Sequence, residues 1–399
     1  MHRRKVGVLA LGALAVAGLA FMWSARPAAP ERLVGAVCRS RAGDERRTCY
    51  VRLLVGYLNK YGVARAVETL DSLAAADPEV AQHAHEYAHG IGMMAYDHAP
   101  DIATTFVDCG DGAASGCRHG FMQAYFQQRK QLGAADVRGL CQPLEAGTFN
   151  RALRFQCFHG MGHGLTMFRG HDAPRALKDC DLLETEWSRV SCYEGVFMEA
   201  FINATASHHA TASHDPAGGP GHGHGGAYKA IDPADPLYPC SIMEQRYLFA
   251  CYHFQTTVIL HLNGGDIPAA ARECDRAPAD MRLPCYESLG RDVIMYASRD
   301  PKKTAQLCAG GNALYRSACY SAAARALVNW TGTPDDGLAL CRVVAGRGPE
   351  HANDATECYT GLGVAIAALF VTPEERDRAC ARAPAPGAVA ACRRGAQSS

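Results

Sequence analysis

The chain has 399 residues, 48% of them hydrophobic, which is enough to bury a large core either as one extended array or as two domains. Its 40 basic and 40 acidic residues balance, so the basic excess of most nucleic-acid-binding proteins is missing and we expect no nucleic-acid partner. The 18 cysteines agree with export to an oxidising compartment.

Residues 1–30 are expected to target the chain to a membrane. Basic residues from His2 to Lys5 precede an uncharged run from Val6 to Trp23, which approaches the length of a transmembrane helix. A cleaved signal peptide is the alternative, but Trp23 stands where a cleavage site after Ala25 needs a small residue. We therefore favour an uncleaved signal anchor as the membrane contact. Both alternatives place the rest of the chain outside the cytoplasm, either anchored on the periplasmic or extracellular face or secreted.

The cysteines fall into nine neighbouring pairs, several of them separated by eleven residues: 38/49, 109/117, 141/157, 180/192, 240/251, 274/285, 308/319, 341/358 and 380/392. In an exported protein this number and arrangement indicate a disulfide framework. No CxxC motif occurs, which argues against zinc ribbons, thioredoxin-like redox sites and c-type haem attachment.

The second cysteines of these pairs recur at a nearly fixed period. From Cys251 onward they advance in steps of 34, 34, 39 and 34 residues, and this range is typical of helical repeats. Asp300-Pro301 provides a helix start between two apolar helical stretches, so each unit is expected to be a helical hairpin. The sequence therefore predicts an all-α fold after the transmembrane anchor, with about ten disulfide-stapled hairpin repeats in an α-solenoid, or superhelix.

Over roughly residues 35–395 this layout resembles the cysteine-rich, tetratricopeptide-like repeat proteins found outside bacterial cells, in which helical hairpins carry a cysteine near each helix junction. The resemblance implies a right-handed superhelix and often a binding role. It implies no histidine site.

One insertion interrupts the period. Residues 203–239 add about 24 residues to one step and contain a stretch rich in His, Gly, Pro and Ser, which we expect to form a flexible loop. This loop either collects metal ions or is a polar loop of biased composition. It separates the histidine-bearing repeats of residues 31–202 from the C-terminal repeats of residues 240–399.

A metal-ligand side chain stands two residues after the second cysteine, or after its equivalent Tyr87, in six repeats, of which the last carries Glu287. The five taken as candidate ligands are His89, His119, His159, Glu194 and His253. Two further histidines, His85 and His163, lie four residues from His89 and His159 and so share a helix face with them. We predict that these seven side chains include the ligands of a metal site. The alternative is a polar groove without metal. The glycines at the next position recur as other small residues where no histidine precedes them, so we assign them to helix packing.

Imidazole and carboxylate ligands suit zinc, copper or non-haem iron. Glu86, Glu194 and Glu199 are the carboxylates positioned to act as a base on a metal-bound water, with Glu86 and Glu194 as the predicted catalytic pair. Residues 85–89 also match the HExxH motif of zinc proteases, but the third ligand of the extended motif would fall on Ala95. We therefore expect His85 and His89 to share an ion with histidines of neighbouring repeats.

The predicted function is that of an extracytoplasmic metalloprotein, with metal-assisted hydrolysis and copper or iron oxidation as the candidate reactions. The alternative is a disulfide-rich scaffold that binds a protein or peptide partner in its groove without catalysis.

Overall fold

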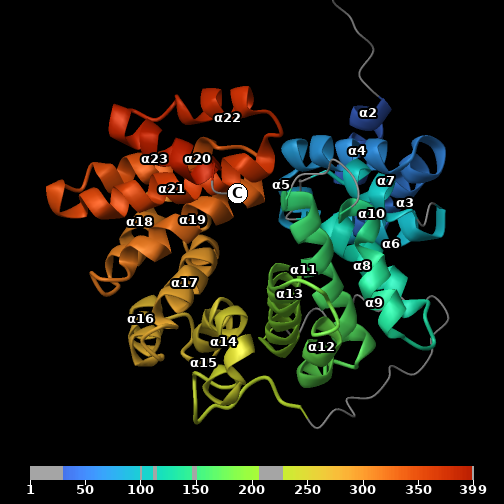
Figure 1. The fold of residues 1–399 in the computed structure, drawn as a ribbon. Coiled ribbons are helices and arrows are strands. Elements are labelled where there is room, and N and C mark those ends of the chain that lie inside the picture. The colour runs from blue at the N-terminus through green and yellow to red at the C-terminus, as the bar shows by residue number, and fades with distance from the viewer. Residues whose placement is uncertain (1–29, 99–100, 111–114, 146–150, 206–227, 398–399) are drawn as a thin grey trace, which may run out of the picture.

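The computed structural model describes residues 30–98, 101–110, 115–145, 151–205 and 228–397. Regular structure within these ranges is helical throughout, with no strand (Figure 1). The prediction of an all-α fold is therefore confirmed for the part of the chain that the structure describes.

One set of helices packs side by side in chain order and forms what we call the central row. Its members are α3 (Gly43–Tyr61), α6 (Ala84–His98), α8 (Gly116–Gln127), α11 (Arg151–Phe168), α13 (Glu186–Thr205), α14 (Gln245–Tyr252), α15 (Thr256–Leu262), α17 (Arg282–Tyr296), α19 (Arg316–Thr331), α21 (Ala352–Leu369) and α23 (Pro386–Gln397).

Shorter helices flank this row and alternate with it along the chain. They are α2 (Pro30–Arg39), α4 (Val63–Ala76), α5 (Pro78–Gln82), α7 (Ile102–Asp108), α9 (Ala134–Leu140), α10 (Gln142–Glu145), α12 (Ala173–Cys180), α16 (Ile267–Arg276), α18 (Pro301–Ala309), α20 (Asp335–Ala345) and α22 (Pro373–Cys380), with short 3₁₀ turns η3 (Cys240–Ile242) and η4 (Pro349–His351). Figure 1 shows the row turning from α6 and α8 through α11 and α13 to α17–α23, and α11 also contacts α21.

The flanking helices begin at caps that the sequence encodes. The aspartates that accept a hydrogen bond from a backbone N–H in the first turn of the following helix are Asp77, Asp101, Asp172, Asp266 and Asp300. Such a bond satisfies one of the amide groups that a helix N-terminus leaves without a partner. A proline within the first two helical positions follows Asp77, Asp172, Asp266 and Asp300, where its missing N–H has no cost.

All 18 cysteines lie within the described residues and form the nine neighbouring disulfides expected from the sequence, with Cα separations of 5.5–5.9 Å. In each disulfide the second cysteine belongs to a helix of the central row, and the first lies in, or directly after, a shorter element that precedes that helix in the chain. Nine disulfides are the mark of an oxidising, extracytoplasmic environment.

The predicted signal anchor lies outside the described residues, which begin at Pro30. Among the helices that the structure describes, none is long and apolar enough to cross a bilayer. Residues 206–227 of the predicted flexible insertion also fall outside the described ranges. Of the residues on either side of them, α13 continues to Thr205, and the amide of Gln255 donates hydrogen bonds to the carbonyl oxygens of Pro236 and Tyr238.

Candidate metal centre

Three histidines of the central row converge between α8 and α11. His119 comes from α8, and His159 and His163 come from successive turns of α11. All three are buried, and each offers one ring nitrogen that lies within 4.8 Å of the other two. The Nε2 atoms of His159 and His163 are 3.2 Å apart. Two nitrogens bound to one tetrahedral zinc ion would be separated by about 3.3 Å, so this pair already has the spacing of two ligands of one ion.

The packing of the central row explains why the histidines meet here. A methyl group on Gly195 of α13 would overlap the carbonyl oxygen of His159, and one on Gly162 would overlap that of Cys192, so α11 and α13 touch backbone to backbone. In α8 the residue equivalent to Gly162 is Met122, whose side chain packs against Gly160 of α11. This side chain separates α8 from α11, and the wider interface accommodates the imidazole rings.

The shell around the three histidines is mostly apolar. The ring of His159 stacks on Phe155 at a centroid distance of 5.2 Å, and the ring of Phe254 lies 6.1 Å from it. Met122 and Met161, on the same helices as the three histidines, are fully buried. An apolar shell of this kind excludes water and strengthens electrostatic interactions within the site.

The same burial controls the protonation of the rings. Burial, and then the neighbouring His163, lowers the pKa of both His119 and His159 well below the ordinary histidine value. Both rings are therefore neutral at pH 7, which is the form that binds a metal ion. An ion would not need to displace a proton from either ring.

His163 is oriented by a carboxylate from the next helix. Its Nδ1 atom lies 2.9 Å from Oε2 of Glu199 on α13, and both side chains are largely buried. A carboxylate accepts hydrogen bonds, so Nδ1 of His163 carries the hydrogen and its Nε2 lone pair faces His159. This is the arrangement in which a histidine serves as a metal ligand while its other nitrogen donates to a carboxylate.

Two nitrogens of the cluster lack the partners that buried polar atoms normally have. Nε2 of His119 and Nδ1 of His159 are buried and have no hydrogen-bond partner among the described residues. Since buried polar atoms are nearly always satisfied, such atoms need an explanation, and an ion bound between the rings would supply one for His119.

Comparison with known proteins adds no assignment. The chain matches no protein-family model, no curated protein and no solved structure. The chemistry of the site therefore rests on its own geometry.

The HExxH histidines lie beside this group. His85 and His89 on α6 are half-buried, and the ring of His85 is 5.7 Å from that of His119. Their own ring centroids are 6.3 Å apart. Glu86, predicted as a base, has a side chain that is 62% exposed and lies 3.4 Å from Nδ1 of His83.

The other two predicted ligands, Glu194 and His253, pair with each other. Nδ1 of His253 lies 2.8 Å from Oε1 of Glu194. On the other side of the same ring, Nε2 of His253 lies 3.9 Å from Oε2 of Glu287. Arg325 in turn donates a hydrogen bond to Glu287. The structure thus connects side chains from α13, the C-terminal end of α14, α17 and α19 next to the three-histidine group.

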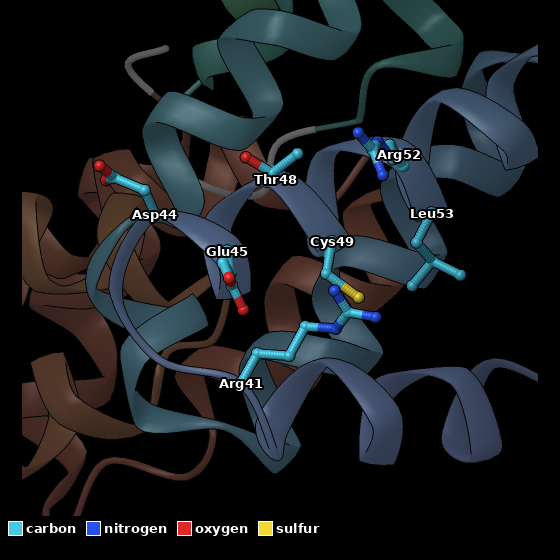
Figure 2. Close-up of a pocket in the computed structure, with 7 residues that line it drawn as sticks. All are labelled: Arg41, Asp44, Glu45, Thr48, Cys49, Arg52 and Leu53. Carbon is cyan, nitrogen blue, oxygen red and sulfur yellow. The ribbon is translucent and has the colours of Figure 1, made fainter.

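Two surface hollows lie elsewhere. Figure 2 shows one on α3 and the loop before it, lined by side chains of both charges: Arg41, Asp44, Glu45, Thr48, Cys49, Arg52 and Leu53. A second hollow between α9 and α13 includes Phe158, the residue before His159. Neither has a histidine in its lining.

Sequence reasoning missed the contact between Glu199 and His163 and the role of Met122. The aligned repeats carry a partial signal for the second. The position five residues after the second cysteine, or after Tyr87, is glycine at 92, 162, 290 and 363, but it is Leu54, Met122 and Phe197 in other repeats. A large residue there agrees with a wider interface at α8 but does not single out that interface.

Proposed function

We propose that this protein is an exported helical-repeat protein that binds one divalent transition-metal ion through His119, His159 and His163. The observation that carries the proposal is the proximity of three buried imidazoles whose ligand atoms lie within 4.8 Å of one another. Polar side chains are costly to bury without partners, and a shared ion would supply a partner for Nε2 of His119, which has none among the described residues.

Zinc is the metal that this ligand set suits best. Neutral imidazoles are preferred zinc ligands, and the Nε2 separation of 3.2 Å between His159 and His163 agrees with tetrahedral coordination. A non-haem iron site commonly uses two histidines and one carboxylate, whereas the group here contains three histidines. Copper remains the second metal, since imidazole suits it as well.

Three protein ligands leave one position of a tetrahedral zinc ion for water or substrate. Zinc in such a site lowers the pKa of its bound water to about 7, so activation of water is the chemistry that the ion would supply. Glu194 and His253, which lie next to the group, are the candidates for moving a proton. This part of the proposal makes hydrolysis the reaction class if the protein is an enzyme.

The repeat architecture and location complete the proposal. The row of helices with a disulfide at each step, and the period near 34 residues, favour a superhelical array like that of cysteine-rich tetratricopeptide-like proteins. The uncharged run of residues 6–23 favours a membrane anchor in the N-terminal part of the chain.

Elemental analysis of the full-length protein, purified with its disulfides intact, tests the proposal. We expect one zinc ion per chain, and its loss in the double variant His159→Ala with His163→Ala at unchanged helicity. A variant lacking residues 208–224, which removes the histidines of the insertion, should retain the ion. A wild-type protein that binds no ion after reconstitution with zinc or copper would refute the proposal and favour the metal-free scaffold.

A further inference from the structure

Five of the six histidines on α6, α8 and α11 form a line that runs from half-buried to buried, namely His89, His85, His119, His163 and His159, whereas His98 lies at the exposed end of α6. Successive ring centroids along it are 6.3 Å apart between His89 and His85, 5.7 Å between His85 and His119, and 4.7 Å between His119 and His163. His85 and His89 are half-buried, whereas the three members of the proposed site are buried. His85 and His89 therefore lie on the solvent side of the buried group.

A buried metal site needs an entry path, because the ion arrives hydrated and must exchange its water for protein ligands. Phe155 and Phe254, which lie against the ring of His159, offer no ligands for a partly dehydrated ion. The imidazoles of α6 do offer them on the side of His119. His119 is near both groups, 5.7 Å from His85 and 4.7 Å from His163 between ring centroids, so it can serve an ion on either side.

We propose that His85 and His89 form an outer, weaker site for the same divalent metal ion, and that the ion passes from it to the buried site through His119. The inference rests on the proposed function of the buried site. His85 and His89 are four residues apart on one helix, which places both rings on the same face, where they can hold one ion. Each transfer replaces a water or a nitrogen on the ion by another nitrogen lone pair and involves no change of oxidation state.

The local packing keeps the outer pair in place without enclosing it. A methyl group on Gly116, at the start of α8, would lie 2.6 Å from the carbonyl oxygen of His85 and 3.1 Å from its Nδ1, so this glycine lets the His85 ring sit against α8. Gly90, beside His89, differs from the aligned glycines of α8 and α13, because no atom lies within 4 Å of an added methyl group there. At Gly90, therefore, α6 is not packed against a neighbouring element.

Zinc titration and cobalt uptake by the metal-stripped, full-length protein test the inference. We expect the wild type to bind one ion tightly and a second weakly, and His85→Ala with His89→Ala to abolish only the weak binding. The same double variant should take up Co²⁺ at the buried site about tenfold more slowly, measured by stopped-flow absorption, because the ion loses its intermediate ligands. The matched control is His83→Ala, which removes a half-buried histidine of the preceding turn and should change neither quantity.

The possible results separate the two proposals. If the double variant folds with wild-type helicity but binds two ions and loads at the wild-type rate, the outer site is refuted. If it loses the tight ion at equilibrium, His85 or His89 is a ligand of the buried site and the inference is again wrong. The single variant His89→Ala, which leaves the contact of His85 with α8 intact, repeats the test should the double variant be misfolded. A wild type without any bound ion refutes the proposed function itself.

Discussion

Nδ1 of His163 lies 2.9 Å from Oε2 of Glu199, a residue 36 positions later in the chain and one helix further along the central row. The carboxylate also lies 4.0 Å from Nδ1 of His171, which follows the C-terminal end of α11. Glu199 therefore connects α13 to the ring that presents its Nε2 to the proposed ion, and it selects the tautomer able to bind one.

Replacing Glu199 by glutamine should weaken zinc binding about 10- to 100-fold, because the amide no longer holds the Nδ1–H of His163 as strongly. Competition with a chromophoric chelator measures this affinity. Glu194→Gln is the matched control, since it alters a buried carboxylate of the same helix that bonds to His253 instead. Equal losses in the two variants would show that Glu199 has no specific connection to the site.

Gly195 and Gly90 occupy equivalent positions in the aligned repeats but differ in their surroundings. Gly195→Ala should destabilise the protein by about 1–3 kcal/mol, because the added methyl group overlaps the carbonyl oxygen of His159 and forces α13 away from α11. Gly90→Ala should be neutral or stabilise the fold by up to about 1 kcal/mol, since it removes a glycine from a helix where space is open. Chemical denaturation measures both effects.

Zinc affinity, measured in both glycine variants, distinguishes a displacement of the site from a general loss of stability. Gly195→Ala should also weaken zinc binding, because it displaces the backbone of a ligand, while Gly90→Ala should not. A Gly195→Ala protein with unchanged stability would contradict the backbone-to-backbone contact.

Disulfide pairing and helical class were accessible from the sequence because they depend on short-range patterns. The cysteine pairs lie 8–17 residues apart and the caps lie within one helical turn. The tight crossings of helices were predicted in part: Gly120 and Gly195 do pack against a neighbouring backbone, but Gly90 does not. Whether a glycine is packed depends on the facing residue of another repeat, which alignment on a single position does not reveal.

The candidate ligands were predicted as a row along the repeats, and the structure brings three of them together in one buried group. Alignment on the second cysteine placed His119 and His159 at equivalent positions, and the spacing of four residues added His163. The same alignment grouped Glu194 and His253 with them, yet these two bond to each other. The difference arises because Met122 widens one interface and Gly162 narrows the next, a three-dimensional effect of side-chain volume between helices.

Removal of the metal should lower the stability of the protein in proportion to the affinity of the site. An ion that binds only the folded chain stabilises it by about 2.7 kcal/mol when its free concentration is 100 times the dissociation constant. Thermal unfolding should therefore shift to higher temperature as zinc is added to the stripped protein. The His159→Ala and His163→Ala double variant should show no such shift, and an identical shift in that variant would place the ion at another site.

The disulfide Cys141–Cys157 should matter to the site beyond its contribution to stability. Cys157 stands two residues before His159 on α11, and its bond closes a 16-residue separation. Removing a disulfide that closes a loop of about this size costs about 3 kcal/mol in the chain-entropy description. Replacing both cysteines by alanine should thus destabilise the fold and also weaken zinc binding, since the first turns of α11 lose their link to the chain between α9 and α10.

The disulfide Cys274–Cys285 provides the matched comparison. It closes an 11-residue separation between α16 and α17, and neither helix carries any of the three histidines. Removing this disulfide should lower the free energy of unfolding by a similar amount, about 3 kcal/mol, but leave the zinc affinity of the folded protein unchanged. Denaturation and chelator competition on both double variants measure the two quantities separately. If both lower the affinity equally, the bond at Cys157 acts on the site only through global stability, and the rigid start of α11 has no specific part in holding His159 in position.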